Sequence, residues 1–396
     1  MVTAARGDRL AVNALISLPL TGGGPGYTCE RILAEMVDGA TSTALYTPAD
    51  RRPRVETGIT VHAAVPRWAR SLPFRSLSAI SAPLAERMFA ADCAADRDAA
   101  AFLWGDVSPR LIGWLRDSGT FIVREKYNCG KAVSKDIMAR AYAGLDAMDA
   151  YPAHQYSAEL IAAEHDSFGA SDMIFCPSPM VAWSLREVGI AEEKLVATSY
   201  GFDPLRFQGD SRALSEIDGP TFVFAGYICV RKGAHILLEA WKQAGVRGRL
   251  VLVGQIEPLI AERYADVLAR DDVEYHAFAS DIGAFYRSAD YFIFPTLEEG
   301  GPQVTYEAAY CHLPSIVSQM GAGAILRDGV EGHIVGSDAI ADWAEALVAA
   351  ERERGTEAYR TLATAARARA ENFTWDRVGK QRREALLEKR DALLPR

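Results

Sequence analysis

The sequence predicts an α/β fold made of two Rossmann-like halves, each a parallel sheet covered by helices on both faces. Short β-branched or aromatic runs alternate with longer windows rich in Ala, Leu and Glu, and the runs are apolar almost throughout. Such strands are typical of parallel sheets buried on both sides. The pattern restarts after the loop-like stretch 204–220. The 396 residues, 49% hydrophobic and 24% charged, exclude a disordered or fibrous chain and suit two or three domains.

The strand candidates are short apolar runs bounded by turn residues. In the first half they are Leu10–Ser17, Thr43–Thr47, Ile59–Ala64, Ala101–Trp104, Phe121–Arg124, Met173–Cys176 and Leu195–Thr198. In the second half they are Thr221–Ala225, Arg249–Val253, Val273–His276, Tyr291–Phe294, Ser315–Val317 and His333–Val335. Helical windows lie between them, as in Ala234–Ala244, where Leu237, Leu238 and Trp241 share one face.

The best candidate for a domain boundary is the stretch from Pro204 to Pro220, which also contains Gly209 and Gly219. We expect a first domain at residues 1–203 and a second at 204–374. The charge-mixed tail predicts a helix at about residues 375–396, with Leu386 and Leu387 on its apolar side, that packs back on the first domain.

The overall charge restricts the partners of the protein. Lys and Arg number 43 and Asp and Glu number 52, which gives a net charge of −9. Proteins that bind nucleic acid through its backbone usually have the opposite balance, so we expect no nucleic-acid partner. If the ligand is an anion, its site must be positive locally.

Neither a membrane span nor a disulfide framework is expected. No apolar window approaches the roughly 18 residues of a membrane span. Leu10–Leu20 is shorter and runs into Gly22-Gly23-Gly24, which predicts a first buried strand rather than a signal peptide. The cysteines are scattered without C-x-x-C spacing, as in a reduced cytoplasmic protein, and zinc is not expected. They are Cys29, Cys93, Cys129, Cys176, Cys229 and Cys311.

The segment 66–89 interrupts the alternation of strands and helices. Its basic residues, Arg67, Arg70, Arg75 and Arg87, outnumber the single Glu86, and aromatic and aliphatic residues lie among them. Three prolines predict that it is divided into short helices; they are Pro66, Pro73 and Pro83. Two interpretations stay open: a solvated helical lid on the first domain, or a surface that touches anionic lipid or the acceptor of a reaction.

The densest chemical signal follows the predicted strand at 291–294. A glycine-rich turn comes after Pro295, and a helix is predicted to open near Pro302, where a proline suits the first helical position. The N–H groups of Gln303 and Val304, with the helix dipole, form an anion site at the carboxyl end of a strand. Ligands of open α/β sheets bind at that edge.

Two carboxylates accompany this anion site. Glu299 lies on the turn and Glu307 more than a turn into the helix. A carboxylate can accept two hydrogen bonds from a vicinal diol, so one glutamate suits a ribose and the other suits hexose hydroxyls. The alternative for either glutamate alone is a solvated helix residue.

Glu299 and Glu307 are separated by seven residues, and Ala-Ala-Tyr-Cys-His-Leu-Pro314 follows. This resembles the E-x7-E motif of retaining glycosyltransferases of the GT-B fold, particularly glycosyltransferase family 4. Further segments resemble the family in the same order. They are Ser171–Ser178, Tyr200–Asp203, the phosphate-contacting loop Gly226–Gly233, Ala289–Pro295, Val317–Gly323 and Arg327–Gly332.

The resemblance implies two Rossmann-like domains that face each other across a cleft, with the acceptor on the first and a nucleotide-sugar on the second. Glu307 would bind the ribose and Glu299 the donor sugar, while Lys232 and Arg231 would neutralise the diphosphate leaving group without a metal. No cofactor is implied besides the nucleotide-sugar co-substrate. The other implied donor-binding residues are Gly23 and Gly24 before a helix near Tyr27, Gly226, Gly300, Gly301, Pro302, Gln303 and Val304.

The chain departs from the family pattern in two places. Tyr227 stands where the family usually has an arginine. Either Arg231 takes the place of that arginine, or the site binds phosphate more weakly. The family often has a histidine where this chain has Arg124, Glu125 and Lys126, which become the candidate acceptor-side residues. His154 and His165 are expected on the surface or on the acceptor side.

Other motifs do not support a different chemistry. A metal-binding D-x-D motif is matched in sequence by Asp96-Arg97-Asp98. We expect no metal site there, because the match falls in a predicted helical window rather than at the end of a strand. The glycines at 22, 24 and 26 do not complete a dinucleotide-binding G-x-G-x-x-G. Neither G-x-S-x-G nor H-E-x-x-H occurs, so hydrolase and zincin readings lack support.

The sequence therefore predicts a retaining, metal-independent hexosyltransferase. It would move a hexose from a UDP- or GDP-sugar to a hydroxyl of a saccharide, a lipid-linked glycan or a small molecule. We expect it in the cytoplasm, with peripheral contact to the inner face of the membrane through residues 66–89 as one option. Two alternatives stay open: another GT-B enzyme, such as a phosphorylase or an epimerase, and a non-catalytic nucleotide-sugar-binding scaffold.

Overall fold

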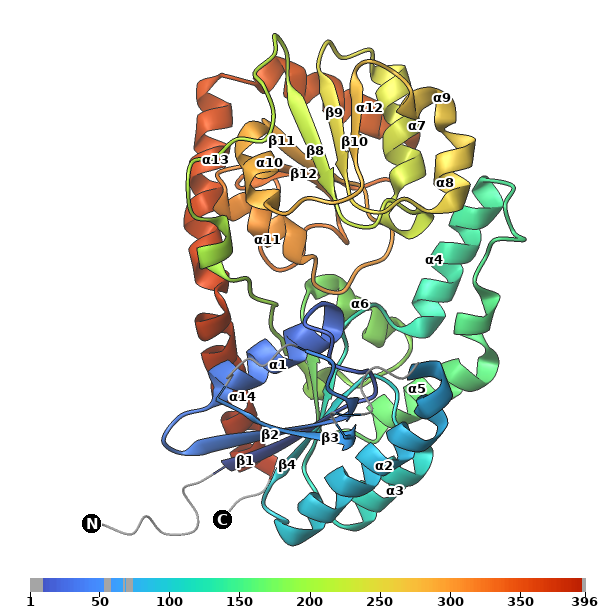
Figure 1. Cartoon of the computed structure of the whole chain (residues 1–396), viewed down its shortest axis with the longest axis vertical. Coiled ribbons are helices and arrows are strands. Elements are labelled where there is room, and N and C mark those ends of the chain that lie inside the picture. Colours follow the sequence, from blue (N-terminus) through green and yellow to red (C-terminus); the bar gives the residue numbers. More distant parts are fainter. Residues whose placement is uncertain (1–9, 53–57, 67, 69–73, 394–396) are drawn as a thin grey trace.

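The computed structural model describes residues 10–52, 58–66, 68 and 74–393, and it contains two parallel sheets stacked end to end (Figure 1). The first has the strand order β3-β2-β1-β4-β5-β6-β7 and the second β10-β9-β8-β11-β12-β13. All strand pairs are parallel, for example Val12 of β1 opposite Ala100 of β4. The prediction of two Rossmann-like α/β halves is confirmed.

The strands agree with the predicted ones, with small differences at their ends. The first sheet contains β1 (Leu10–Ile16), β2 (Thr41–Ala49), β3 (Thr60–Val65), β4 (Ala100–Trp104), β5 (Ile122–Glu125), β6 (Met173–Cys176) and β7 (Leu195–Ala197). The second contains β8 (Thr221–Ala225), β9 (Arg249–Val253), β10 (Val273–His276), β11 (Tyr291–Phe294), β12 (Ser315–Ser318) and β13 (Gly332–Val335). The central strands β4, β8 and β11 are buried along their whole length, which explains their unbroken apolar sequence.

Helices cover the faces of both sheets (Figure 1). Those of the first half are α1 (Gly24–Met36), α2 (Phe74–Ala95), α3 (Pro109–Asp117), α4 (Lys131–Gly144), α5 (Ala158–Gly169) and α6 (Pro179–Glu187). The later ones are α7 (Ala234–Ala244), α8 (Pro258–Arg263), α9 (Ala265–Leu268), α10 (Ile282–Ser288), α11 (Gln303–Tyr310), α12 (Ile340–Glu353), α13 (Glu357–Ala370) and α14 (Trp375–Leu393). Short 3-10 helices are η2 (Ala153–Tyr156), η3 (Glu192–Lys194), η4 (Pro204–Phe207), η5 (Val230–Lys232) and η6 (Glu371–Phe373).

The segment 66–89 differs from its prediction. Pro83 lies inside α2, which continues through it as one long helix. Ala85, Phe89 and Cys93 recur at a spacing of four and are buried in the core, and this packing offsets the hydrogen bond that the proline removes. Of the predicted basic residues, Arg67 and Arg70 lie outside the described residues.

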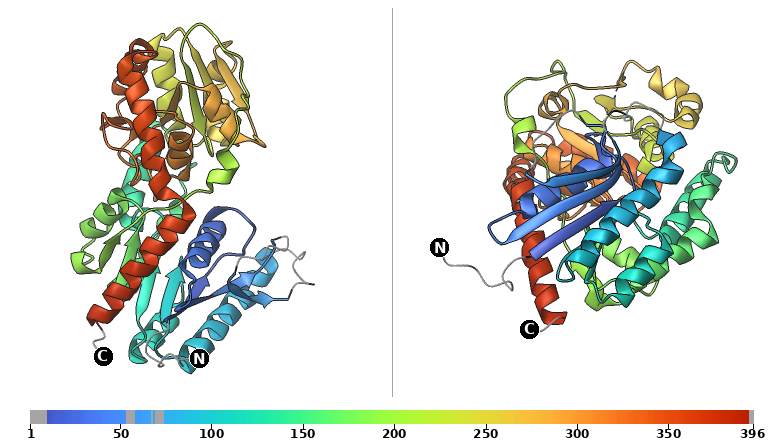
Figure 2. Two further views of the ribbon diagram at one scale, coloured as in Figure 1. Left: turned by 90° about the vertical axis from the view of Figure 1, so that its left-hand side faces the viewer. Right: turned by 60° about the horizontal axis from the view of Figure 1, so that its bottom comes forward.

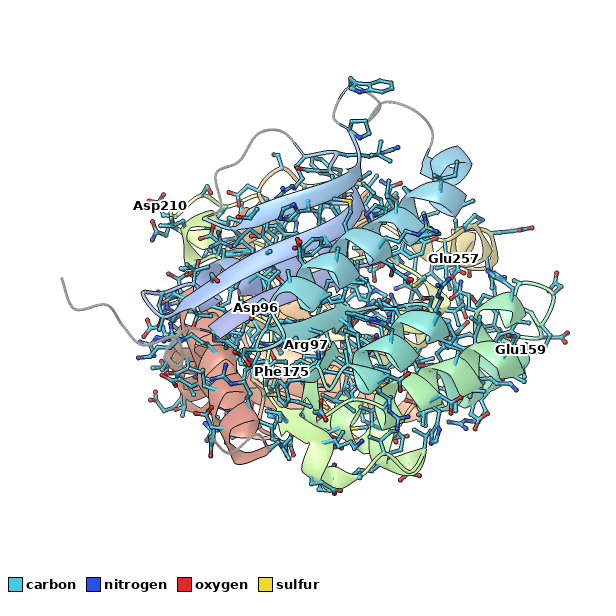
Figure 3. The ribbon with its side chains drawn as sticks, turned by 90° about the horizontal axis from the view of Figure 1, so that it is seen from below. Asp96, Arg97, Glu159, Phe175, Asp210 and Glu257 are labelled. Carbon is cyan, nitrogen blue, oxygen red and sulfur yellow. The ribbon has the colours of Figure 1, made fainter. Side chains whose placement is uncertain are left out.

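The D-x-D sequence also lies elsewhere than expected. Asp96-Arg97-Asp98 follows the end of α2 and forms the turn that leads into the amino end of β4 (Figure 3). The helical window therefore ends earlier than predicted. Ligand sites of parallel sheets lie at the carboxyl ends of the strands, so this turn is at the opposite edge.

The C-terminal helix returns from the second half to the first, as Figure 2 shows. The chain crosses between the halves at two adjacent segments, where the Phe202 N–H donates to the Phe373 carbonyl at 3.1 Å. Helix α14 packs directly on α1, and Trp375 meets Tyr27 edge to face at 6.1 Å between ring centroids. The domain limits at 203/204 and 374/375 stay a prediction.

Candidate functional site

The carboxyl edges of the two sheets face each other, and the loops after β5 and β11 touch. A Cβ on Gly300 would lie 1.8 Å from the carbonyl oxygen of Tyr127, and one on Gly301 would lie 2.5 Å from the Tyr200 ring. Only glycine permits so close an approach of the two backbones. The glycine-rich turn therefore has a packing role at the interface between the domains.

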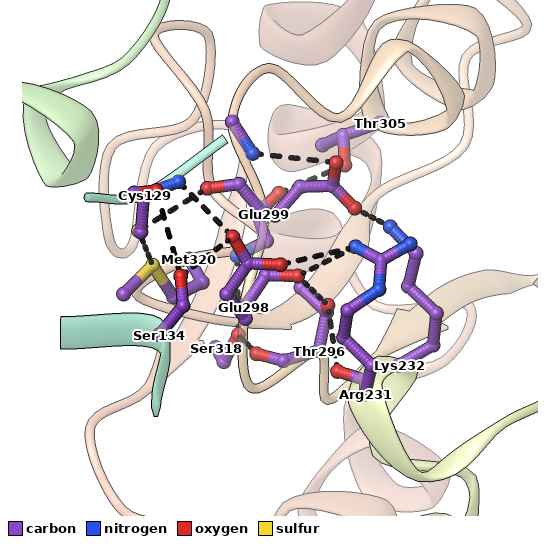
Figure 4. Close-up of polar contacts among 12 residues, drawn as sticks. Cys129, Ser134, Arg231, Lys232, Thr296, Glu298, Glu299, Thr305, Ser318 and Met320 are labelled. Carbon is purple, nitrogen blue, oxygen red and sulfur yellow. Dashed lines mark hydrogen bonds and ion pairs between the residues drawn. The ribbon is translucent and has the colours of Figure 1, made fainter. Parts of the chain in front are cut away.

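Two cations and a carboxylate meet beside this turn (Figure 4). Arg231 and Lys232 both come from η5, and the Lys232 ammonium forms an ion pair with the Glu299 carboxylate. Gly233 follows at φ 70°, and a Cβ there would lie 1.9 Å from the Pro295 carbonyl oxygen. The loop is thereby held against the end of β11, and the structure brings together the three residues predicted as catalytic.

Lys232 is buried beside a second cation, and this lowers its pKa although it pairs with Glu299. Burial, with repulsion from the neighbouring Arg231, lowers the pKa of Lys232 to about 7. A polyanionic ligand placed between these two cations would raise that pKa and favour the ammonium form.

Glu298 is a site residue that the sequence prediction missed. Its carboxylate accepts hydrogen bonds from the Cys129 N–H at 3.0 Å and the Ser134 hydroxyl at 3.2 Å, both from the first domain. It also lies 3.2 Å from Nη1 of Arg231. Glu298 is 2% exposed and joins the two domains at the site. Its only sequence signal is its place beside Glu299.

Helix α11 carries Glu307 on its second turn. Loss of hydration raises the pKa of Glu307 to about 7, although the Arg206 charge and the Tyr286 hydroxyl, at 3.5 Å, favour the carboxylate. Pro302 is the N-cap rather than the first helical residue, because its ψ of 88° is not helical. The helix therefore begins at Gln303, whose side chain donates to the Gly201 carbonyl at 3.1 Å.

The two glycine-rich loops near the cleft leave their backbones open. Gly23 caps α1, and among the described residues no neighbouring atom lies within 4 Å of a Cβ placed on Gly23, Gly24 or Gly226. Helix α1 begins at Gly24 and not near Tyr27, because Pro25 favours a helical φ in the first turn. Their role in donor binding stays a prediction.

A polar cavity of about 540 Å³ lies on the first-domain side of the site. Most of its lining comes from the segment 124–131 and from α5, and the second domain contributes Arg231 and Glu298. His154 lines it, whereas the exposed His165 does not and instead lies 3.7 Å from Asp166.

The three candidate acceptor-side residues all line the cavity but differ in their contacts. Glu125 is fully buried in a bidentate ion pair with Arg382 of α14, at 2.7 and 3.1 Å, so its carboxylate is already occupied. The Lys126 ammonium pairs with Glu164 at 2.6 Å. Arg124 has no ion pair among the described residues.

Part of the chain is similar in sequence to known proteins. Residues 219–352 match the family model described as glycosyl transferases group 1. The second domain matches the group 1 glycosyl transferases. A curated relative, the D-inositol 3-phosphate glycosyltransferase of Xylanimonas cellulosilytica, is 32% identical over 170 residues, which is 40% of this chain and 40% of the relative. That of Pseudarthrobacter chlorophenolicus is 28% identical over 187 residues, 43% of this chain and 44% of the relative.

Solved structures match along nearly the whole chain, whereas the curated relatives match over less than half of their length. Sucrose-phosphate synthase from Thermosynechococcus elongatus has a TM-score of 0.71 at 18% identity and covers 97% of this chain and 100% of its own. Anabaena HepE in complex with UDP has a TM-score of 0.65 at 14% identity, with coverages of 96% and 100%. The GT-B fold and the resemblance to group 1 glycosyl transferases are thereby confirmed.

Two further observations concern membranes and metals. Within residues 10–52, 58–66, 68 and 74–393, no helix is long and apolar enough to cross a membrane. In the same described ranges, no cluster of three or more His, Cys, Asp or Glu side chains is arranged to hold a metal ion.

Proposed function

We propose that the protein is a retaining glycosyltransferase that moves a hexose from a UDP- or GDP-sugar to an acceptor hydroxyl. The acceptor would be a saccharide, a lipid-linked glycan or a small molecule. The observation that carries the proposal is the juxtaposition of Arg231, Lys232 and Glu299 at the turn before α11, facing the first domain.

In the proposed reaction the diphosphate is the leaving group. Arg231 and Lys232 bind its developing negative charge, which fixed cations stabilise without reorganisation. The Lys232–Glu299 ion pair opens when the donor enters, so that Lys232 turns to phosphate and Glu299 accepts hydrogen bonds from the sugar hydroxyls. Glu307 accepts hydrogen bonds from the ribose diol.

Retention would follow from attack on the same face as the departing group. The acceptor oxygen forms a bond to the anomeric carbon while the bond from that carbon to the diphosphate oxygen breaks. The acceptor proton passes to a diphosphate oxygen, so the nucleoside diphosphate leaves with that proton. This scheme needs no metal ion and no cofactor.

The comparisons support the choice of donors to test. Solved structures similar to this chain include Anabaena HepE in complexes with UDP, with UDP and glucose, and with UDP-glucose. UDP-glucose is therefore the first donor to try, and GDP-sugars the second. We also propose that the protein is cytoplasmic and contacts the membrane peripherally through residues 66–89. Trp68 in this segment is 82% exposed.

A non-catalytic nucleotide-sugar-binding scaffold is the second candidate. It is favoured by Tyr227, which replaces the family arginine, and by the absence of a histidine among residues 124–126. A phosphorylase or an epimerase is the remaining alternative within this fold.

The test begins with a thermal-shift screen of UDP, GDP and their sugars on the full chain. We expect selective stabilisation by one donor, followed by release of free nucleoside diphosphate only when an acceptor is present. Binding without turnover over a broad acceptor panel would favour the scaffold, and failure of every nucleotide to bind would overturn the proposal. Product formation without release of a nucleoside diphosphate would favour the phosphorylase or the epimerase.

A further inference from the structure

The charged groups around the 540 Å³ cavity are unevenly paired. Each carboxylate that lines it already has a cationic partner close by. The pairs are Glu125 with Arg382 at 2.7 Å, Glu164 with Lys126 at 2.6 Å, Asp106 with Lys131 at 2.9 Å, and Glu298 with Arg231 at 3.2 Å. Among the described residues that line the cavity, Arg124 is the cation without a carboxylate partner.

Arg124 is buried, and no described residue forms an ion pair with it. It is 2% exposed, and within the described part of the chain its Nε and Nη1 atoms have no hydrogen-bond partner. Its guanidinium lies 4.9 Å from the centroid of the Phe168 ring, which supports the cation but does not neutralise it. Burial lowers the pKa of Arg124 to about 10, although Asp106 and Glu164 act in the opposite direction from farther away.

An unpaired buried guanidinium costs free energy, because it has lost its hydration and gained no counter-ion. A ligand oxyanion that enters the cavity would recover that cost. Guanidinium groups suit this role because their planar array of N–H donors matches carboxylate and phosphate oxygens.

We propose that this cavity binds the acceptor through an oxyanion, a phosphate monoester or a carboxylate, with Arg124 as its counter-ion. The proposal rests on the proposed glycosyl transfer and specifies its acceptor class. The cavity volume suits a molecule of monosaccharide size. Asn128, Gln155 and Tyr156 also line the cavity and offer polar groups for hydroxyls.

The position of the cavity relates this anion site to the donor. Arg231 lines the cavity and also lies beside Lys232 on η5. An acceptor held at Arg124 would therefore present a hydroxyl toward the donor site. The donor diphosphate and free inorganic phosphate are the other sources of an oxyanion that the test must separate.

The experiment measures binding of matched neutral and anionic probes by calorimetry, with UDP present and absent. The pairs are glucose with glucose 6-phosphate, glucose with glucuronate, and myo-inositol with its monophosphate; inorganic phosphate is measured alone. We expect one anionic probe to bind about 10- to 100-fold more tightly than its neutral partner. We expect Arg124→Gln to remove this preference, Arg124→Lys to retain part of it, and the exposed control Arg116→Gln to leave it intact.

Three outcomes overturn the proposal. They are equal or absent binding of both members in every pair, an unchanged preference in Arg124→Gln, and inorganic phosphate binding as tightly as the sugar phosphates. A loss of UDP affinity in Arg124→Gln would assign Arg124 to the donor instead. If UDP fails to bind the wild-type protein, the proposed function fails, while the anion preference can still be measured without it.

Discussion

Two charged segments face each other across the cleft, and they use their charges differently. At the carboxyl end of β5, Glu125, the last residue of the strand, pairs with Arg382 of α14, and the following Lys126 pairs with Glu164 of the first domain. In the segment after β11, Glu299 pairs with Lys232 of η5. The first pairing joins residues 257 positions apart, whereas the Lys232–Glu299 contact lies within one domain. Two segments of similar charge can therefore have different roles, because the role of a charged side chain depends on the partner that it meets in the fold.

The largest expected effect is on the first segment. Removing the Glu125 carboxylate with Glu125→Ala leaves Arg382 buried and unpaired, which should lower the free energy of unfolding by about 3–5 kcal/mol. Chemical denaturation measures this. The exposed pair of Arg186 and Glu192 is the control, and Glu192→Ala should lower the free energy of unfolding far less, because solvent screens this pair. Equal small losses in both variants would mean that Glu125 is free to act on the acceptor.

The next effect tests the second segment. Lys232→Ala should lower turnover by about 100- to 1,000-fold, because it removes a fixed cation from the leaving group. Steady-state release of nucleoside diphosphate measures it, and Lys242→Ala, on the exposed face of α7, is the control. Wild-type turnover in Lys232→Ala would remove this lysine from the mechanism.

The third prediction concerns Glu307 and the dependence of nucleotide affinity on pH. With a pKa raised to about 7, Glu307 is partly protonated in the free protein below neutrality. Only the carboxylate accepts hydrogen bonds from both ribose hydroxyls, so nucleotide affinity should increase as the pH rises through 7. Calorimetry between about pH 6 and pH 8 measures this. Glu307→Gln should bind about tenfold more weakly at the higher pH and without that dependence. A flat profile in the wild-type protein would contradict the ribose assignment.

The smallest effect concerns the contact between the segments. Ser134→Ala removes one hydrogen bond to Glu298 and should lower the free energy of unfolding by about 1 kcal/mol. In a Glu298→Ala background the same substitution should cost almost nothing, which a double-mutant cycle measures. Additive losses would show that the two residues act independently.

Much of the fold could be predicted because its signals are local. The buried strands are short apolar runs, and their alternation with helices predicts parallel sheets. The errors are local as well. Pro83 does not break α2, because core packing sustains the helix, and Pro302 is a cap rather than the first helical residue, because its ψ is not helical.

The site could be predicted only in part, for the same reason. The sequence predicts Arg231, Lys232 and Glu299 at one site, and in the structure Lys232 pairs with Glu299 while the neighbouring Arg231 contacts Glu298. Glu298 was missed, because its contacts with Cys129 and Ser134 come from the other domain. The sequence does not distinguish two adjacent glutamates that face different partners.

Local sequence is enough to predict the two parallel sheets, the glycine-rich turn and the two glutamates with seven residues between them, because each depends on neighbours along the chain. Only the tertiary structure decided that Glu125 is closed by Arg382, that Glu298 joins the domains and that Arg124 has no counter-ion among the described residues. These three outcomes depend on contacts between distant segments. Pairing in a medium of low dielectric, rather than residue type, sets the cost and the role of a buried charge.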